Sequence, residues 1–464
     1  ELRWARFGEA WRVVADRIAI SHPALGVTVS GDVEWTPGAA PVARLLADIG
    51  NGDLEQLPSL LPHGVLPGPG DAWIRRAIQG GRITGGSAVL RGALDRFPFD
   101  EQDGVFELRV NVSDGMIEFH ERWPRIEEMD GEIVYEQRRL TIDAPGGRML
   151  GVNLRDVVAT IPDVTRKGRI VEARGRALTS AAAGLALVQA SPLAGKLGPR
   201  LASLNLRGDL ALDLDLRIPL KKEEKKDWSG KVHLAGNSVQ LVNPPLEFDA
   251  IEGEFEFVDA HWAAPKLRAI YLGEPVWLDL EGGIAQGPVR ERYRMHGVGG
   301  RELLRKRFEA TAPGLADWLA ERSLLDAVDG STEWRAEMTV DAEGARHLRV
   351  DSTLAGVAIA LPAPLAKDAA SEVPIRVEAT VGDPDEPLTL VYGDRVHAEV
   401  GLARTPAGGL QITDAAIALG GGPPGASRPA GLWLEGSTPA IDYNRWRETL
   451  FPPGVTARPY SERP

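Results

Sequence analysis

Side chains capable of catalysis or metal binding are scattered along this sequence without the spacing that such chemistry requires. The chain has eight histidines, and none stands at metal-ligand spacing from another; His120-Glu121 does not continue into a His-Glu-x-x-His motif. There is no cysteine, which excludes disulfides, thiolate zinc sites and a cysteine nucleophile. There is also no Gly-x-Ser-x-Gly elbow. Gly195-Lys196 and Gly230-Lys231 do not continue into a nucleotide-binding loop, because an apolar residue follows each lysine.

The acidic pairs of the sequence are better explained as exposed strand positions than as an active site. Asp213 and Asp215 alternate with leucines, and Glu254 and Glu256 alternate with phenylalanines. Side chains two residues apart on a strand share a face, so these carboxylates belong to a polar face. The glycine-rich stretch 296–304 fits a plain turn before a helix. We therefore predict that the protein is not an enzyme and binds no metal or cofactor.

The elements that position these residues are strands with one apolar and one polar face. Residues 204–220, LNLRGDLALDLDLRIPL, alternate strictly with a period of two, and the pattern recurs at 104–112, 253–258 and 373–381. The sequence therefore predicts a mainly β fold with helical insertions, built on a long, curled antiparallel sheet that forms an elongated groove with an apolar inner face. The candidate lining residues are Leu108, Val110, Leu210, Leu212, Leu214, Leu216, Ile218, Phe255, Phe257, Ile375 and Val377.

Turn residues separate the strands, and helical patterns interrupt them in a few places. Gly- and Pro-rich turns at intervals of about 8–12 residues are typical of an antiparallel meander. Helical insertions are predicted near 39–61, 70–80, 176–203, 301–328 and 441–451. No short repeat is evident, so we expect residues 1–464 to form one elongated section of a β-groove.

Composition narrows the possible partners. The chain has 464 residues and a formal net charge of −13, which argues against a nucleic-acid partner. The charged run 221–227 is predicted to be a solvated loop. No apolar run reaches the length of a membrane-spanning helix, since 181–197 is interrupted by Pro192 and Gly195. The first residues show no signal-peptide pattern, and both ends are expected to be cuts through a larger protein.

Several segments together resemble the YhdP family, which belongs to the AsmA-like bacterial envelope proteins that also include TamB. These segments are, in order, 72–99 (AWIRRAIQGGRITGGSAVLRGALDRFPF), 123–151 (WPRIEEMDGEIVYEQRRLTIDAPGGRMLG), 189–198 (QASPLAGKLG), 206–220 (LRGDLALDLDLRIPL) and 354–367 (LAGVAIALPAPLAK). Each motif alone has low specificity, because it consists of apolar alternation with proline and glycine markers. Their common order and spacing, over nearly the whole chain, make the resemblance specific.

The resemblance implies a function that composition does not. Family members resemble bridge-type lipid transporters, which are anchored in the inner membrane by an N-terminal helix and extend through the periplasm of Gram-negative bacteria. It therefore implies a section of a monomeric, passive hydrophobic conduit that carries phospholipid acyl chains between the inner and outer membranes. The parts that meet the two membranes would lie outside this chain. The family has no catalytic motif to transfer to these residues.

Two other readings remain open at this point. One is a structural β-rich envelope scaffold whose apolar face is packed dry. The other is a carbohydrate-active enzyme, for which tryptophans and acids must share a face, as Trp277 with Asp279 and Trp433 with Glu435 do. Substitution of Leu214 by aspartate separates conduit from scaffold, because it should empty a groove of lipid but unfold a dry core.

Overall fold

Antiparallel strands make up most of the computed structural model, which describes residues 1–22, 25–56, 68–99, 101, 103–166, 170–195, 204–219, 227–241, 245–383, 386–405, 410–425 and 431–452. Within these residues, 24 strands belong to one sheet and two form a small separate sheet. The chain packs as two units. Unit 1 comprises 1–202, 207–233 and 256–259, and unit 2 comprises 203–206, 234–255 and 260–464. The mainly β fold predicted from the sequence is confirmed.

Within the described residues, the elements of unit 1 are eleven strands, two α-helices and two short 3-10 helices. They are β1 (Leu2–Phe7), β2 (Ala10–His22), β3 (Leu25–Trp35), β4 (Val42–Asp53), η1 (Leu54–Gln56), α2 (Gly68–Ala77), β5 (Ile78–Ala93), η2 (Leu94–Arg96), β6 (Val105–Ile117), β7 (Ile126–Glu136), β8 (Arg139–Met149), β9 (Val152–Ile161), β10 (Ile170–Ser180), α3 (Ala181–Gln189) and β12 (Asp209–Pro219). Residues of both units occur in β11 (Leu204–Arg207), β13 (Asp227–Leu241) and β14 (Leu246–Val258).

The described part of unit 2 contains the remaining strands, three α-helices and one short 3-10 helix. They are β15 (His261–Tyr271), β16 (Glu274–Gly282), β17 (Val289–Gly300), α5 (Arg301–Thr311), α6 (Pro313–Glu321), η3 (Leu325–Ala327), β18 (Val328–Asp329), β19 (Ser331–Asp341), β20 (Arg346–Ser352), β21 (Ala358–Ile359), β22 (Ile375–Thr380), β23 (Leu388–Tyr392), β24 (Val396–Arg404), β25 (Leu410–Leu419), β26 (Leu432–Gly436) and α7 (Tyr443–Leu450).

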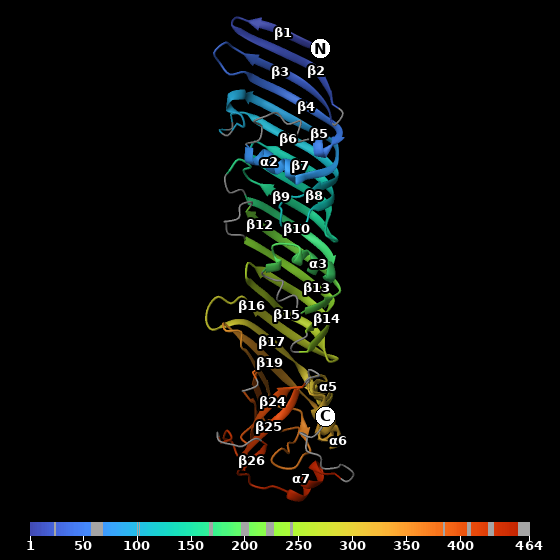
Figure 1. Ribbon diagram of the computed structural model, residues 1–464, viewed down its shortest axis with the longest axis vertical. Helices are drawn as coiled ribbons and strands as arrows, with labels where there is room; N and C mark the ends of the chain where they lie inside the picture. Colours follow the sequence, from blue (N-terminus) through green and yellow to red (C-terminus); the bar gives the residue numbers. More distant parts are fainter. Residues whose placement is uncertain are drawn as a thin grey trace. The chain divides into compact units, whose positions relative to one another are not determined.

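Most strands pair with their neighbours in the sequence. β1 to β10 follow one another in this way, and so do β15 to β17 and β22 to β25 (Figure 1). These pairings are antiparallel, as the alternating sequence predicts. One pairing differs, because β26 runs parallel to β25. The sheet is therefore mixed at that strand.

The helix predicted near 39–61 is wrong where the structure describes it. Residues 42–53 form β4, and 57–61 lie outside the described residues. Helical spacing had placed Leu45, Leu46 and Ile49 on one face. In the strand, Ile49 is buried (8% exposed) while Leu46 lies on the other face (47% exposed). β4 pairs with β3 on one side and β5 on the other, and these two ladders of hydrogen bonds outweigh the local helical pattern.

Helices occur within the other four regions for which the sequence predicted them. α2 covers 68–77, while 78–80 already belong to β5. In the region 176–203, the first residues are the end of β10. Ser180 then caps α3 by accepting a hydrogen bond from the Ala183 amide at 3.2 Å. Residues 196–203 lie outside the described residues. Pro313 separates α5 from α6, because proline suits the first turn of a helix. Asp442 caps α7 through the Arg445 amide at 3.0 Å.

Each unit has its own buried clusters on one side of its strands. In unit 1, Leu54, Ile83 and Val110 are almost fully buried, and Trp73 and Ile74 of α2 pack against their cluster. In unit 2, one cluster surrounds Ala264 and Val276. A second, smaller cluster contains Tyr392. No helix in the described part of the chain combines the length and hydropathy needed to cross a bilayer.

Candidate functional site

The candidate lining residues of β12 occupy the less exposed face of that strand. Leu210 and Ile218 are each 8% exposed, and the three leucines between them are half-buried. Asp213, Asp215 and Arg217 on the other face are exposed. The alternation read from the sequence is therefore present in the fold. The half-burial of the central leucines leaves part of each side chain free to contact something outside the protein.

Small residues stand beside these leucines on the neighbouring strand. In the ladder between β10 and β12, Leu212 is opposite Ala177, Leu214 is opposite Gly175 and Leu216 is opposite Ala173. A methyl group or a hydrogen fills little of the space above the sheet, so on the β10 side the leucines are not matched by equally large neighbours. Ile218 also belongs to the buried cluster that contains Phe99 and Tyr135, and Leu216 packs against that cluster.

The candidate residues of β6 are covered by protein. Val110 is 1% exposed and belongs to the cluster of unit 1 that contains Leu54 and Ile83. Leu108 is half-buried against that cluster. Trp73 and Ile74 of α2 pack on this cluster, and the indole of Trp73 donates a hydrogen bond to the Phe119 carbonyl at 3.1 Å. The candidate residues of β6 thus belong to a packed cluster that includes side chains of α2.

The two candidate phenylalanines of β14 contact different neighbours. Phe255, in unit 2, stacks on Trp262 with ring centroids 5.7 Å apart. Phe257, in unit 1, lies against Gly230, where an added Cβ would come within 2.6 Å of the ring. Both rings are half-buried, and the glutamates beside them are exposed.

The candidate residues of β22 show the same alternation in unit 2. Ile375 and Val377 are half-buried, and Arg376 and Glu378 on the other face are exposed. Ile375 packs with the cluster around Tyr392, and Val377 is opposite Val350 on one side and Leu390 on the other.

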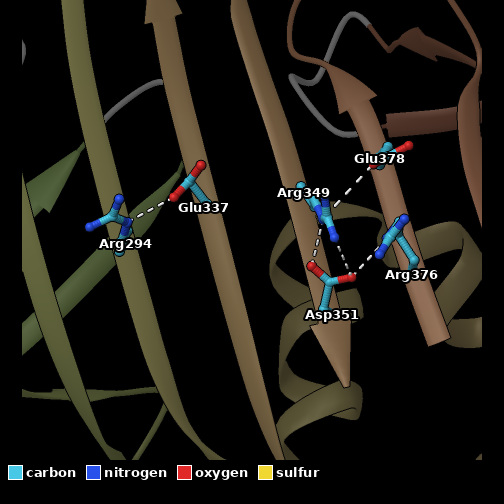
Figure 2. A network of polar contacts seen from close by, with 6 residues as sticks. All are labelled: Arg294, Glu337, Arg349, Asp351, Arg376 and Glu378. Atoms are coloured by element: carbon cyan, nitrogen blue, oxygen red, sulfur yellow. Dashed lines mark hydrogen bonds and ion pairs between the residues drawn. The ribbon is translucent and has the colours of Figure 1, made fainter. Parts of the chain in front are cut away.

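Charged side chains cover the opposite face of these strands and pair across them. Figure 2 shows a network in unit 2 in which Asp351 of β20 accepts hydrogen bonds from Arg349 at 2.7 Å and from Arg376 of β22 at 2.8 Å. On adjacent strands, Arg294 donates to Glu337 at 2.8 Å. Burial alone would raise the pKa of Asp351, but the two arginines outweigh it and hold that pKa below its ordinary value.

Unit 1 repeats this arrangement. Asp32 of β3 accepts hydrogen bonds from Arg12 of β2 at 3.1 Å and from Arg44 of β4 at 2.6 Å. Burial raises the pKa of Asp32, but the hydrogen bonds from Arg44 and Arg12 lower it by more, so that the net pKa lies below the ordinary value. These faces are therefore polar and tied together across strands.

Sequence reasoning missed three side chains on the less exposed face of unit 2, namely Trp262, Glu291 and Tyr293. Tyr293 lies 6.0 Å from Trp262 between ring centroids. A register shift between Ala264 and Leu267 changes which alternate residues of β15 face the buried side. The period-two pattern breaks at this bulge, so alternation along β15 does not show which face Trp262 occupies.

The described residues contain no group of three or more histidine, aspartate or glutamate side chains that could hold a metal ion. The sequence suggested a carbohydrate enzyme from two tryptophan–acid pairs, and side chains of both pairs have contacts with other residues. Asp279 accepts a hydrogen bond from the Lys266 amide at 3.0 Å, and Trp277 stacks on His296 with centroids 5.4 Å apart. Glu435 accepts a hydrogen bond from the Gly425 amide at 2.6 Å.

Comparisons with known proteins agree with the resemblance seen in the sequence. The family model described as "YhdP protein" matches residues 1–458. The "Intermembrane phospholipid transporter YhdP" of Escherichia coli (strain K12) is 24% identical over 342 residues, which is 73% of this chain and 26% of that protein. The chain therefore matches about a quarter of the length of that relative. No solved structure matches the chain.

Proposed function

The chain belongs to the YhdP family, and on that premise we propose that its sheet holds phospholipid acyl chains and conducts them passively between the inner and outer membranes. The name of the E. coli relative supports phospholipid as the cargo. The observation that carries the proposal is the half-burial of Leu212, Leu214 and Leu216 on one face of β12, beside a strand with small side chains.

The physical reason is the cost of exposing acyl chains to water. Each methylene exposed costs about 0.8 kcal/mol, so two chains with about 30 methylenes would cost about 24 kcal/mol. Half-exposed leucines offer these methylenes an apolar contact at nearly the free energy of a membrane interior. A charged headgroup would cost several kcal/mol if buried without partners, so an open-sided path, in which the headgroup meets water or polar side chains, suits both parts of the lipid.

The place of the chain in the cell follows from the same proposal. We infer that it acts in the periplasm of a Gram-negative bacterium as a monomeric section of a longer protein anchored in the inner membrane. The relative is an intermembrane transporter about four times as long as the matched region, which supports such an arrangement. We propose no enzymatic step, and any driving force would come from other parts of the system.

Lipid extraction tests this function directly. The purified chain and an unrelated protein purified in the same way are extracted with organic solvent, and the extracts are analysed by mass spectrometry. More than one phospholipid per chain, absent from the unrelated protein, is the expected result. A lipid-free extract from a folded, monodisperse sample would refute the conduit and favour the dry scaffold.

A further inference from the structure

Three aromatic rings meet on the less exposed face of unit 2. Phe255 of β14 and Trp262 of β15 stack with an interplanar angle of 24°, and Tyr293 of β17 is tilted against Trp262 at 6.0 Å between centroids. All three side chains are half-buried, so part of each ring is accessible. Accessible aromatic rings attract cations because the quadrupole of each ring gives its faces a negative electrostatic potential.

A glycine allows the Trp262 ring to lie across the sheet. Gly282 of β16 is opposite Trp262 on one side and opposite Glu291 of β17 on the other. A Cβ on Gly282 would come within 2.2 Å of the Trp262 ring, so the ring occupies the space above the glycine and extends towards Glu291. The indole Nε1 of Trp262 is buried and has no hydrogen-bond partner among the described residues. Any side chain larger than a hydrogen at position 282 would collide with the ring in this position.

A carboxylate lies next to the aromatic rings. The Tyr293 hydroxyl donates a hydrogen bond to Oε2 of Glu291 at 2.6 Å, so the two side chains share one face of β17. This hydrogen bond fixes Glu291 beside the aromatic group. A cation at this place could contact the faces of the aromatic rings. It could also donate hydrogen bonds to the negatively charged carboxylate of Glu291.

We propose that Phe255, Trp262, Tyr293 and Glu291 form a recognition site for the primary ammonium headgroup of an aminophospholipid. This inference rests on the proposed function, because it takes the lipid's acyl chains to lie on the same face of the sheet. A primary ammonium carries three N–H donors for the carboxylate, and a quaternary ammonium carries none. A headgroup whose only charge is a phosphate is repelled by Glu291. The site thus selects among phospholipids by headgroup while the leucines accept any acyl chain.

Competition between two lipids tests the proposal. The purified chain is incubated with vesicles of phosphatidylethanolamine and phosphatidylglycerol in equal amounts, re-isolated and extracted, and the ratio of the two bound lipids is measured by mass spectrometry. Cation attraction at partly exposed rings favours an ammonium by a factor of about 2 to 5. We expect phosphatidylethanolamine to be enriched by at least this factor over the vesicles.

Two variants and one control assign the selectivity to these residues. Glu291→Gln keeps an acceptor for the Tyr293 hydroxyl but removes the charge, and Trp262→Leu removes the central ring. Both should bring the ratio close to that of the vesicles. Glu337→Gln removes a carboxylate from the opposite face of β19, where it pairs with Arg294, and should keep the enrichment.

The outcomes separate this inference from the function on which it rests. Bound lipid without headgroup preference in the unmodified chain, or an enrichment that Glu291→Gln leaves intact, would overturn the ammonium site and leave the conduit standing. A chain that takes up neither lipid would overturn the proposed function and the ammonium site with it.

Discussion

Replacing Leu214 by aspartate discriminates most sharply between a lipid path and a dry core. Leu214 is half-buried opposite Gly175. Complete burial of a leucine is worth about 1.5–3 kcal/mol, so loss of a half-buried one should lower the free energy of unfolding by about 1–1.5 kcal/mol, provided that water reaches the new carboxylate. The same carboxylate among acyl chains costs several kcal/mol, and each 1.4 kcal/mol is a tenfold change in occupancy. Bound phospholipid should therefore fall at least about tenfold.

The assay pairs lipid extraction with urea unfolding and uses two reference variants. Ala211→Asp places the same charge on the opposite face of β12, opposite the exposed Leu178, and should keep the lipid. Ile83→Asp places it at a site only 1% exposed and should cost more than about 4 kcal/mol. Unchanged lipid in folded Leu214→Asp would refute the reasoning. A loss of stability as large as that of Ile83→Asp would show that the face around Leu214 is packed dry.

Three further changes test the geometry. Gly282→Ala should lower the free energy of unfolding by about 1–3 kcal/mol in urea, because its Cβ would lie 2.2 Å from the Trp262 ring. Asp32→Asn should flatten the acid dependence of stability: the lowered pKa of Asp32 contributes stability above the ordinary carboxyl pKa of about 4, and this is lost as the pH falls through the folded-state pKa. Arg322→Met should speed hydrogen exchange in α7 at least severalfold, since the buried guanidinium donates to the Leu450 carbonyl at 3.0 Å.

Each of these changes has an outcome that would contradict it. Gly146 has open space where a Cβ would go, so Gly146→Ala is the control for the glycine prediction, and equal effects of the two would refute it. Stability profiles of the unmodified chain and Asp32→Asn that run parallel between pH 7 and pH 3 would show that the arginine contacts do not favour the charged form. Unchanged exchange in α7 would show that Arg322 does not hold that helix.

The sequence predicts strands where alternation is unbroken and fails where other strands decide the structure. The residues of β12 and β22 themselves show which face of each strand is less exposed, because every second side chain is apolar. β4 fails as a prediction because its apolar spacing also fits a helix, and only pairing with β3 and β5 decides between the two. Period-two reasoning fails for Trp262 because a bulge shifts the register of β15.

The candidate site was less predictable than the fold. Leu214 and its neighbours could be placed on one face, but their degree of exposure depends on the small residues of β10, which are far away in the sequence. Trp262 and Glu291 are both opposite Gly282, on its two sides, and a glycine in a strand does not by itself show which ring lies over it. Cross-strand neighbours of this kind are set by register, which one sequence specifies only weakly when bulges occur.

The pairing of strands with their sequence neighbours has a consequence for how such proteins change during evolution. Because β2 to β9 each pair with the strands before and after them, inserting or deleting one whole hairpin would leave every other pairing in the series intact. Two added strands would widen the sheet by about 10 Å. Such contacts are local along the chain, so strands can be added one after another as the polypeptide emerges. The extent of the sheet across its strands is therefore a trait that selection can adjust in steps of one hairpin, without changes to the strands already present.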